Sequence, residues 1–269
     1  MNRHRRPLID RLLLVSTTRA EEPEMNRTAR FAAVAATVVG AFLATAGAAS
    51  AAEPAPPTGA ASAQSVRSAC PELDDCYGPD EMPAFGAEAI RQVNRYAQQV
   101  RPDVPLPLYR IVERGTTTTS SCVDEYGDSE ADENAAFYCS ADHTVYLGEE
   151  ALWTFYGSYG DAAAMLVVAH EWGHHLQFAG GGPEATDLEL ENQADCIGGS
   201  FLGELAHDGT LRLRDVTDIA RILPDSSENG PDRTHGSLTE RTSAVALGAA
   251  RGLAACDRYV PGSDLTATL

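Results

Sequence analysis

The stretch 162–177 constrains the fold more than any other part of the sequence, because it places the pattern H-E-x-x-H in an apolar run without proline. The pattern consists of His170, Glu171 and His174. On an α-helix, positions i and i+4 lie on the same face, so both imidazoles can reach one metal ion while the glutamate lies beside them to handle a proton. We therefore predict a helix over 161–178, which Asp161 caps and a Gly/Pro segment at 180–183 ends.

The pattern supplies only two metal ligands, its histidines. A catalytic zinc keeps three protein ligands and one open position for water, so a third ligand is needed. A third histidine in the extended pattern would stand at position 180, which is glycine, so that class of site is excluded. The remaining common solution is a glutamate on a second helix, and a helix predicted over 187–206 offers Glu191. Asp195 lies about one turn further on the same face, and we expect it to accept a hydrogen bond from the free ring nitrogen of His170. Glu189 is the rival ligand, but it lacks a carboxylate four residues later.

The amino-terminal region has the composition of an export signal. Met25 opens a short basic segment, an Ala/Gly-rich apolar run follows over 31–48, and Ala49-Ser50-Ala51 supplies the small-x-small cleavage pattern. We predict a signal peptide over 25–51, which makes residues 1–24 an extension ahead of the true start, and a disordered linker over 52–69. A secreted protein with no stable membrane anchor after cleavage is the expected product. A protein held in the membrane by an uncleaved signal is the alternative.

The charge of the chain limits its partners. Its 20 basic residues, all of them arginine, stand against 39 acidic residues, which gives a formal net charge of −19. Such a charge disfavours nucleic acid and anionic lipid surfaces as partners, so no nucleic acid is expected. It could attract basic substrates, but a solvated acidic surface is the simpler explanation.

Six cysteines follow the predicted signal, and an even number in an exported chain predicts disulfides. Proximity in the sequence suggests the pairs Cys70–Cys76 and Cys122–Cys139, which leaves Cys196–Cys256. A structural zinc site built from cysteines is disfavoured, because no C-x-x-C pair is present.

The remaining patterns predict one domain over 70–260, followed by a tail over 261–269. Apolar spacing and capping residues predict further helices over 85–100, 213–223 and 237–250. Strands are predicted over 106–112 and in a hairpin over 136–147, with its turn at 140–142 and its second strand at 143–147. The polar stretch 115–134 is expected to be a long exposed loop.

Three longer segments combine the motifs described above: Phe137-Tyr-Cys-Ser-Ala-Asp-His-Thr-Val-Tyr-Leu147, Ala169-His-Glu-Trp-Gly-His-His-Leu-Gln177 and Glu191-Asn-Gln-Ala-Asp-Cys196. With Thr234-His-Gly-Ser237 and Ala255-Cys-Asp257, they make the chain resemble the bacterial neutral zinc metallopeptidases over most of residues 106–258. The resemblance implies an α+β, zincin-like fold, mainly helical with a small β-sheet, in which the active-site helix packs against a glutamate-bearing second helix.

The resemblance also bears on individual residues. It supports the pairing of Cys196 with Cys256, and it points to His235 as a second donor to the oxyanion of the reaction; a loop-capping role for His235 is equally open. The chain departs from the family pattern after Arg241, where the expected aromatic residues are absent, and at 123–134, where the acidic loop is enlarged. These departures concern substrate preference more than the metal site.

Together these features predict an exported zinc-dependent metalloendopeptidase that acts on a peptide or protein substrate. One catalytic Zn²⁺ is expected on His170, His174 and Glu191, with Glu171 as the base that takes a proton from water and returns it to the leaving amine. The alternatives are a zinc hydrolase of another amide, such as a cell-wall bond, and a non-catalytic secreted binding module with a zincin fold. The intact Glu171 argues against the module, because a metal-binding scaffold needs no base. Nothing in the sequence specifies an oligomeric state.

Other side chains near the motif are expected to have lesser roles. His143 and His175 are not expected to be ligands, because the three-ligand set is already complete. Tyr146 and Tyr156 are weaker candidates than His235 for the oxyanion donor. The strand 143–147 could pair with an extended peptide substrate, or be an ordinary edge strand. Trp172 and Gly173 are expected to serve packing, with Gly173 admitting a neighbouring element close to the helix.

Overall fold

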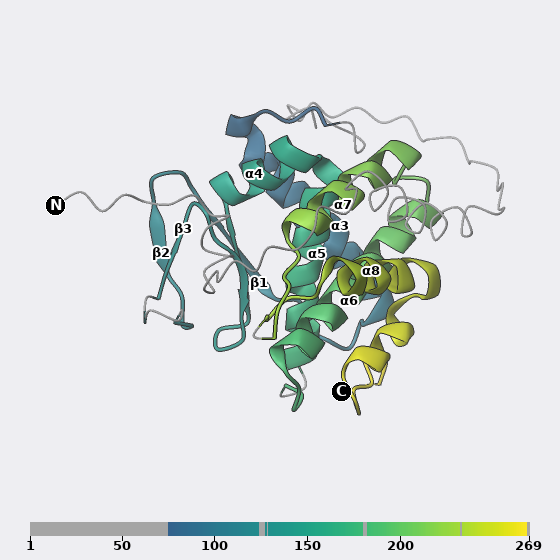
Figure 1. The fold of residues 1–269 in the computed structure, drawn as a ribbon. Helices are drawn as coiled ribbons and strands as arrows, with labels where there is room; N and C mark the ends of the chain where they lie inside the picture. The colour runs from purple at the N-terminus through teal and green to yellow at the C-terminus, as the bar shows by residue number, and fades with distance from the viewer. Residues whose placement is uncertain (1–74, 124–126, 128, 180–181, 232, 268–269) are drawn as a thin grey trace, which may run out of the picture.

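A computed structural model describes residues 75–123, 127, 129–179, 182–231 and 233–267 (Figure 1). The extension 1–24, the signal peptide 25–51, the linker 52–69 and Cys70 lie outside the described residues. The helices are α3 (Met82–Val100), α4 (Glu149–Tyr159), α5 (Asp161–Phe178), α6 (Asp187–His207), α7 (Leu213–Asp225) and α8 (Leu238–Arg251), with 3-10 helices η1 (Pro79–Glu81) and η2 (Leu253–Tyr259). The described fold is mainly helical with a small mixed sheet beside the helices, as predicted.

The main sheet has three strands in the order β1-β5-β4. Strand β1 (Leu108–Val112) runs parallel to β5 (Thr144–Gly148), and β4 (Ala136–Cys139) runs antiparallel to β5 with Cys139 opposite Thr144. The predicted hairpin is therefore present. The prediction that its second strand lies at an edge is wrong, because β1 pairs with the outer side of β5 and makes β5 the central strand. Among the described strands, the free edge on this side of the sheet belongs to β4.

The polar stretch between β1 and β4 is more ordered than the sequence predicts. Strands β2 (Thr117–Thr119) and β3 (Glu130–Asp132) form an antiparallel pair within the region expected to be a loop. Ala131 is buried there, and the disulfide Cys122–Cys139 joins the stretch to β4. A short strand of threonines carries little hydrophobic signal, which is why the pattern of apolar residues misses it.

Helix α5 lies in the centre of the helical layer and contacts α3, α4, α6, α7 and two strands of the sheet (Figure 1). Its bounds agree with the prediction, but its N-cap is Gly160, with φ of 110°, and Asp161 is the first helical residue rather than the cap. Its segment 162–169 is apolar on every side, which is the pattern of a buried helix. Trp172 is 1% exposed, and even His170 and Glu171 are buried.

Helix α6 packs closely against α5 and α8 because each of these helices has a glycine at the contact. A Cβ at Gly173 would lie 3.1 Å from Cα of Ala194, so the predicted close approach of a second element to α5 is present. On the other side of α6, a Cβ at Gly248 would lie 1.8 Å from the carbonyl oxygen of Cys196. The disulfide Cys196–Cys256 ties the same part of α6 to η2.

Two of the helices that follow the motif helix, α6 and α8, start at capping boxes built on a threonine and a serine. Thr186 accepts a hydrogen bond from the backbone of Glu189 at the start of α6, and Ser237 accepts one from Glu240 at the start of α8. The chain also packs beyond the predicted domain end at residue 260. Leu265 is buried in the core, and its carbonyl accepts a hydrogen bond from Arg101.

Two of the predicted disulfides, Cys122–Cys139 and Cys196–Cys256, are present in the described residues. They agree with a location outside the cytoplasm, where disulfides persist. None of the helices in the described part of the chain has the length and apolar character needed to cross a membrane.

We predict that Gly248→Ala destabilises the fold by forcing α8 away from α6, since the added methyl group has no space beside Cys196. Overpacking of this kind costs about 1–3 kcal/mol, so thermal unfolding should shift downward by several degrees. Ser243→Ala, an exposed change on the same helix, is the control and should leave the melting temperature nearly unchanged. A variant as stable as the wild type would show that the two helices separate at little cost.

Candidate metal centre

Helices α5 and α6 bring the three predicted ligands to one point. The Nε2 atoms of His170 and His174 are 3.1 Å apart, and the Glu191 carboxylate lies 3.0 Å from the first and 3.3 Å from the second. Ligand atoms bound at 2.0–2.1 Å to a tetrahedral zinc ion are separated by about 3.3 Å. The spacing of the three donors therefore fits a single zinc ion.

The hydrogen bonds around the imidazoles leave only acceptors at this point. Nδ1 of His170 lies 3.0 Å from Oδ1 of Asp195, and Nδ1 of His174 lies 2.9 Å from Oε1 of Gln177. Both partners are acceptors, so each Nδ1 carries the proton and each Nε2 presents a lone pair. Oε2 of Glu191 is also buried and accepts no hydrogen bond from the described residues. A cluster of lone pairs and a carboxylate is repulsive by itself, and a cation is the group that satisfies it.

Asp195 is fixed by an arginine that the sequence analysis did not single out. Arg241, from the first turn of α8, donates to both carboxylate oxygens of Asp195, at 2.7 and 2.8 Å. The pair is buried, and although burial opposes ionisation, the charge of Arg241 and the bond to His170 lower the pKa of Asp195 to about 2. Asp195 thus remains an acceptor for His170. In the sequence, the role of Arg241 is indicated only by its position as a basic residue one turn into the helix that follows His235.

Gln177 is a second residue that the sequence analysis missed. While its Oε1 contacts His174, its Nε2 donates to the carbonyl of Leu190, at 2.8 Å, and to Oε1 of Gln193, at 3.1 Å. Gln193 in turn donates to Oγ of Ser263. The ring of His174 is therefore oriented by a chain of side-chain amides that reaches α6 and the carboxyl-terminal segment. The sequence could have indicated this role, because Gln177 lies three residues after His174 and therefore on the same face of the helix.

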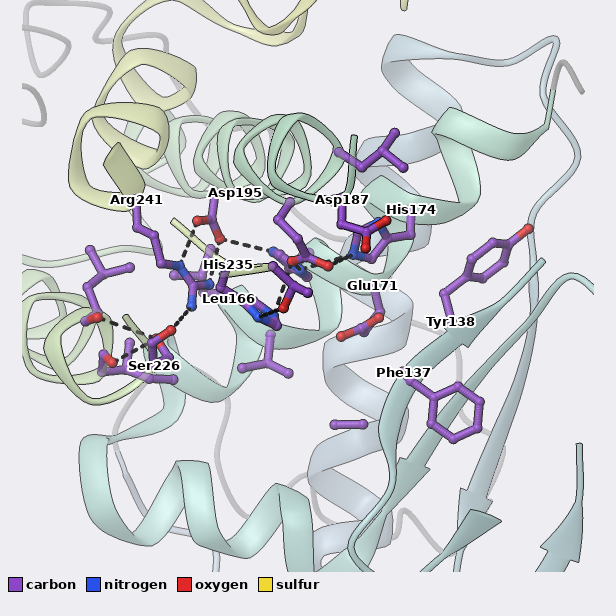
Figure 2. A pocket seen from close by; sticks show the side chains of 18 of the residues that line it. Phe137, Tyr138, Leu166, Glu171, His174, Asp187, Asp195, Ser226, His235 and Arg241 are labelled. Atoms are coloured by element: carbon purple, nitrogen blue, oxygen red, sulfur yellow. Dashed lines mark hydrogen bonds and ion pairs between the residues drawn. The ribbon is translucent and has the colours of Figure 1, made fainter. Parts of the chain in front are cut away.

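Glu171 lies next to the ligands and faces the cavity between them and β4 (Figure 2). Burial raises the pKa of its carboxyl group, and the negative charge of Glu191 adds to that rise. A general base works best with a pKa near the operating pH, so this environment suits proton transfer. Figure 2 shows Asp195 and Arg241 on the far side of Glu171 from Phe137 and Tyr138.

The cavity has a volume of about 520 Å³, which is within the range of ligand sites in proteins. Its polar lining consists of the groups of the candidate metal centre together with Ser140, Asp187, Ser226 and Thr234, and most of the remaining wall is apolar. That wall is formed by Ala136, Phe137 and Tyr138 of β4, Phe155 of α4, Leu166, Val167 and Phe178 of α5, Leu190 of α6, and Ile222 and Leu223 of α7. Edge strand β4 therefore forms one side of the cavity.

His235 also lies at the cavity, in the loop before α8. Its Nε2 is 3.3 Å from Oε2 of Glu191, and its Nδ1 is 3.3 Å from Oε1 of Glu228. Its backbone N–H donates to Glu228 as well. The structure thus places His235 beside a ligand candidate, and it also shows the loop contacts expected of a capping histidine.

The other residues considered in the sequence lie away from the three donors. His143 and His175 both contact the hydroxyl group of Tyr138, and His175 contacts the carbonyl of Pro105. The rival ligand Glu189 serves in the capping box of α6. The hydroxyl groups of two tyrosines are occupied elsewhere: Tyr146 donates to Asp142, and Tyr156 accepts from the backbone of Tyr77.

The described residues thus form a mainly helical fold with a candidate His-His-Glu metal centre. Residues 112–244 match the family described as "Putative neutral zinc metallopeptidase", and the chain belongs to this family through that region. The match includes all three ligand candidates together with Glu171.

Relatives of the chain occur in distant bacteria. It is 30% identical over 146 residues to "Uncharacterized protein YpfJ" of Escherichia coli (strain K12), a match that covers 40% of this chain and 47% of that protein. It is 32% identical over 127 residues to "Uncharacterized protein Rv2575" of Mycobacterium tuberculosis, with 39% and 43% covered. The chain thus spans less than half the length of these curated relatives. No solved structure matches it.

We predict that Asp195→Ala weakens zinc binding by about 10–100-fold, because His170 loses the acceptor that orients its ring. Asp195→Asn keeps an acceptor oxygen and should lose less affinity. Competition with a chromophoric chelator measures both, and Glu204→Gln, which removes a carboxylate farther along α6, serves as the matched control. Unchanged affinity in Asp195→Ala would rule out an orienting role for this carboxylate.

Proposed function

We propose that this protein is an exported zinc-dependent endopeptidase. The observation that carries the proposal is the convergence of two imidazole lone pairs and a carboxylate beside a buried glutamate, within a cavity bordered by an edge strand. His170, His174 and Glu191 would hold the ion, and the spacing of their donor atoms supports that assignment. A bound zinc ion would supply Lewis-acid polarisation of the scissile carbonyl and a water of lowered pKa.

Glu171 is the proposed base. Its carboxylate takes the proton of the attacking water and delivers it to the amine that leaves, so the proton is conserved and one amide bond is exchanged for an acid and an amine. Glu171 lies in the same turn as the ligands without being one of them. Burial also keeps bulk water away from it, so its proton transfers are directed to groups in the cavity.

The substrate is proposed to bind as an added strand along β4. In the described part of the chain no other strand pairs with its outer side, and its residues border the cavity next to Glu171. Backbone hydrogen bonds to an edge strand hold an extended peptide regardless of its sequence. The apolar wall opposite, which includes Leu166 and Ile222, suits an apolar substrate side chain.

His235 is proposed as the second donor to the oxyanion that forms at the carbonyl. Its position beside Glu191 supports the proposal, since a donor must lie next to the place where charge develops. Glu228 contacts the other ring nitrogen and would fix the orientation of the imidazole.

Hydrolysis of another amide, such as a cell-wall bond, would use the same residues and is the alternative within the same chemistry. A non-catalytic binding module is less well supported, because a buried glutamate is costly to retain beside a metal centre that does no chemistry. The two disulfides support a site of action outside the cytoplasm, and export by the signal at 25–51 is part of the proposal. Retention in the membrane by an uncleaved signal is its alternative.

The decisive experiment measures cleavage of casein and of peptide libraries by the purified protein with and without a zinc chelator. We expect cleavage that the chelator abolishes and added zinc restores. Glu171→Gln should bind zinc normally and lose about 10²–10⁴-fold in kcat, because only the proton-transfer group has changed. Glu184→Gln, on the surface, is the control. Retained turnover in Glu171→Gln would eliminate the assigned base, and absence of chelator-sensitive cleavage would contradict the peptidase.

We further predict that His235→Ala lowers kcat by about 10²–10³-fold while zinc affinity is retained, since one oxyanion donor is lost and the three ligands remain. Steady-state kinetics on a cleaved peptide, together with a zinc titration, check this. His207→Ala replaces an exposed histidine at the end of α6 and is the control. A normal kcat in His235→Ala would assign this residue to loop capping instead.

A further inference from the structure

Three aspartates form a second cluster of potential metal ligands in the described residues. Asp75 lies in the segment before η1, Asp161 begins α5 and Asp218 lies on α7, and one carboxylate oxygen from each is within 4.8 Å of the others. Asp75 and Asp161 hold each other through reciprocal bonds, in which each backbone N–H donates to the other carboxylate at 2.9–3.0 Å. The cluster joins three segments that are distant in sequence.

Asp218 lies in this cluster without a compensating partner among the described residues. The residue is 8% exposed, and its carboxylate has no hydrogen bond or ion pair with another described residue. It packs directly on the backbone of Gly160, where a Cβ would lie 2.3 Å from Oδ2 of Asp218. One oxygen of Asp161, Oδ1, is likewise buried without a donor among the described residues. Buried, unpaired carboxylate oxygens are costly unless a cation binds them.

The charged groups around the cluster do not neutralise it. Arg221, one turn along α7 from Asp218, donates its hydrogen bond to the carbonyl of Ser158 instead. Asp215 adds a further negative charge nearby, with its carboxylate used at the start of α7. Burial and the repulsion of neighbouring carboxylates raise the pKa of Asp161 and that of Asp218 to about 7. The helix dipole at the start of α5 favours Asp161, but it does not explain the burial of Asp218.

We propose that Asp75, Asp161 and Asp218 bind a calcium ion that fastens the segment before η1 to α5 and α7. All three donors are carboxylate oxygens, which are the ligands of hard cations rather than of zinc. Calcium tolerates irregular arrangements of 6–8 oxygens, whereas magnesium requires a near-ideal octahedron. The site is separate from the candidate zinc centre, because Asp161 and His170 are about 13 Å apart along α5.

The test is thermal unfolding of the purified, zinc-loaded protein in calcium-free buffer at pH 8, followed by addition of calcium. Sites of this class bind with Kd of about 0.1–1 mM, so about 10 mM calcium should raise the melting temperature by about 3–10 °C. Magnesium should raise it less. Titration calorimetry should find one calcium site in the wild type.

Asp218→Asn locates the effect. The amide relieves repulsion in the calcium-free protein, so this variant should unfold at or above the wild-type temperature without calcium and gain little when calcium is added. Glu113→Gln removes an exposed carboxylate elsewhere and should respond to calcium as the wild type does. No calcium shift in the wild type, or an equal shift in Asp218→Asn, would overturn the proposal. The second outcome would assign calcium to general screening of the acidic surface.

The pH dependence supplies a second readout. The groups that face Asp161 and Asp218 are Asp75, Tyr156 of α4, and Asp215 and Arg221 of α7. Because the folded-state pKa is raised from an unfolded value of about 4, the calcium-free folded state holds more protons, and its stability falls as pH rises from about 4 to 7. The fall should be smaller in Asp218→Asn. Protons compete with calcium, so the wild-type calcium shift should be larger at pH 8 than at pH 5; equal shifts at both would contradict a carboxylate site.

Discussion

The buried ion pair between Arg241 and Asp195 is the interaction on which the candidate metal centre depends. Asp195 is 1% exposed, so water cannot replace Arg241 as its partner, and Asp195 in turn fixes the ring of His170. A buried ion pair contributes little net stability by itself, because desolvation offsets the attraction. Its value here is geometric, since it makes α8 part of a site to which that helix contributes no ligand. The glycine contact between Gly248 and α6 follows from this requirement, because a wider separation would move Arg241 away from Asp195.

Each imidazole is oriented through its second nitrogen by a group that is itself held. For His170 the path runs through Asp195 to α8, and for His174 it runs through Gln177 to Gln193 and the carboxyl-terminal segment. Helix α6 takes part in both paths and also carries Glu191. The disulfide at Cys196 fixes this helix one residue after Asp195, so ligand and orienting groups cannot shift independently. A site assembled in this way reaches its geometry on folding rather than on metal binding.

The sequence predicts those features of the fold and site that depend on residues close together in the chain, and it misses those that depend on residues far apart. The bounds of α5, the start of α6 at Asp187 and the β4–β5 hairpin depend on residues a few positions apart, and the sequence predicts them well. The central place of β5 depends on parallel pairing with β1, more than thirty residues earlier, and no local pattern indicates it. Arg241 was missed for the same reason, because its role exists only once α8 lies against α6. The role of Asp195 could be predicted because its i, i+4 relation to Glu191 is local.

Two groups of carboxylates from several segments gather around helix α5, and their charges can be compared. At the middle of α5, Glu171, Glu191 and Asp195 carry three negative charges against the single positive charge of Arg241, which leaves two uncompensated. At its start, the three aspartates of the cluster and the neighbouring Asp215 stand near the single charge of Arg221, so negative charge is again in excess. Uncompensated charge at these depths is too costly to keep, and protons could remove it only at the expense of the lone pairs and carboxylates gathered there. One divalent cation at each place balances the charge while preserving the donors, so the same electrostatic argument that supports zinc at His170 and His174 supports a harder ion at Asp161 and Asp218.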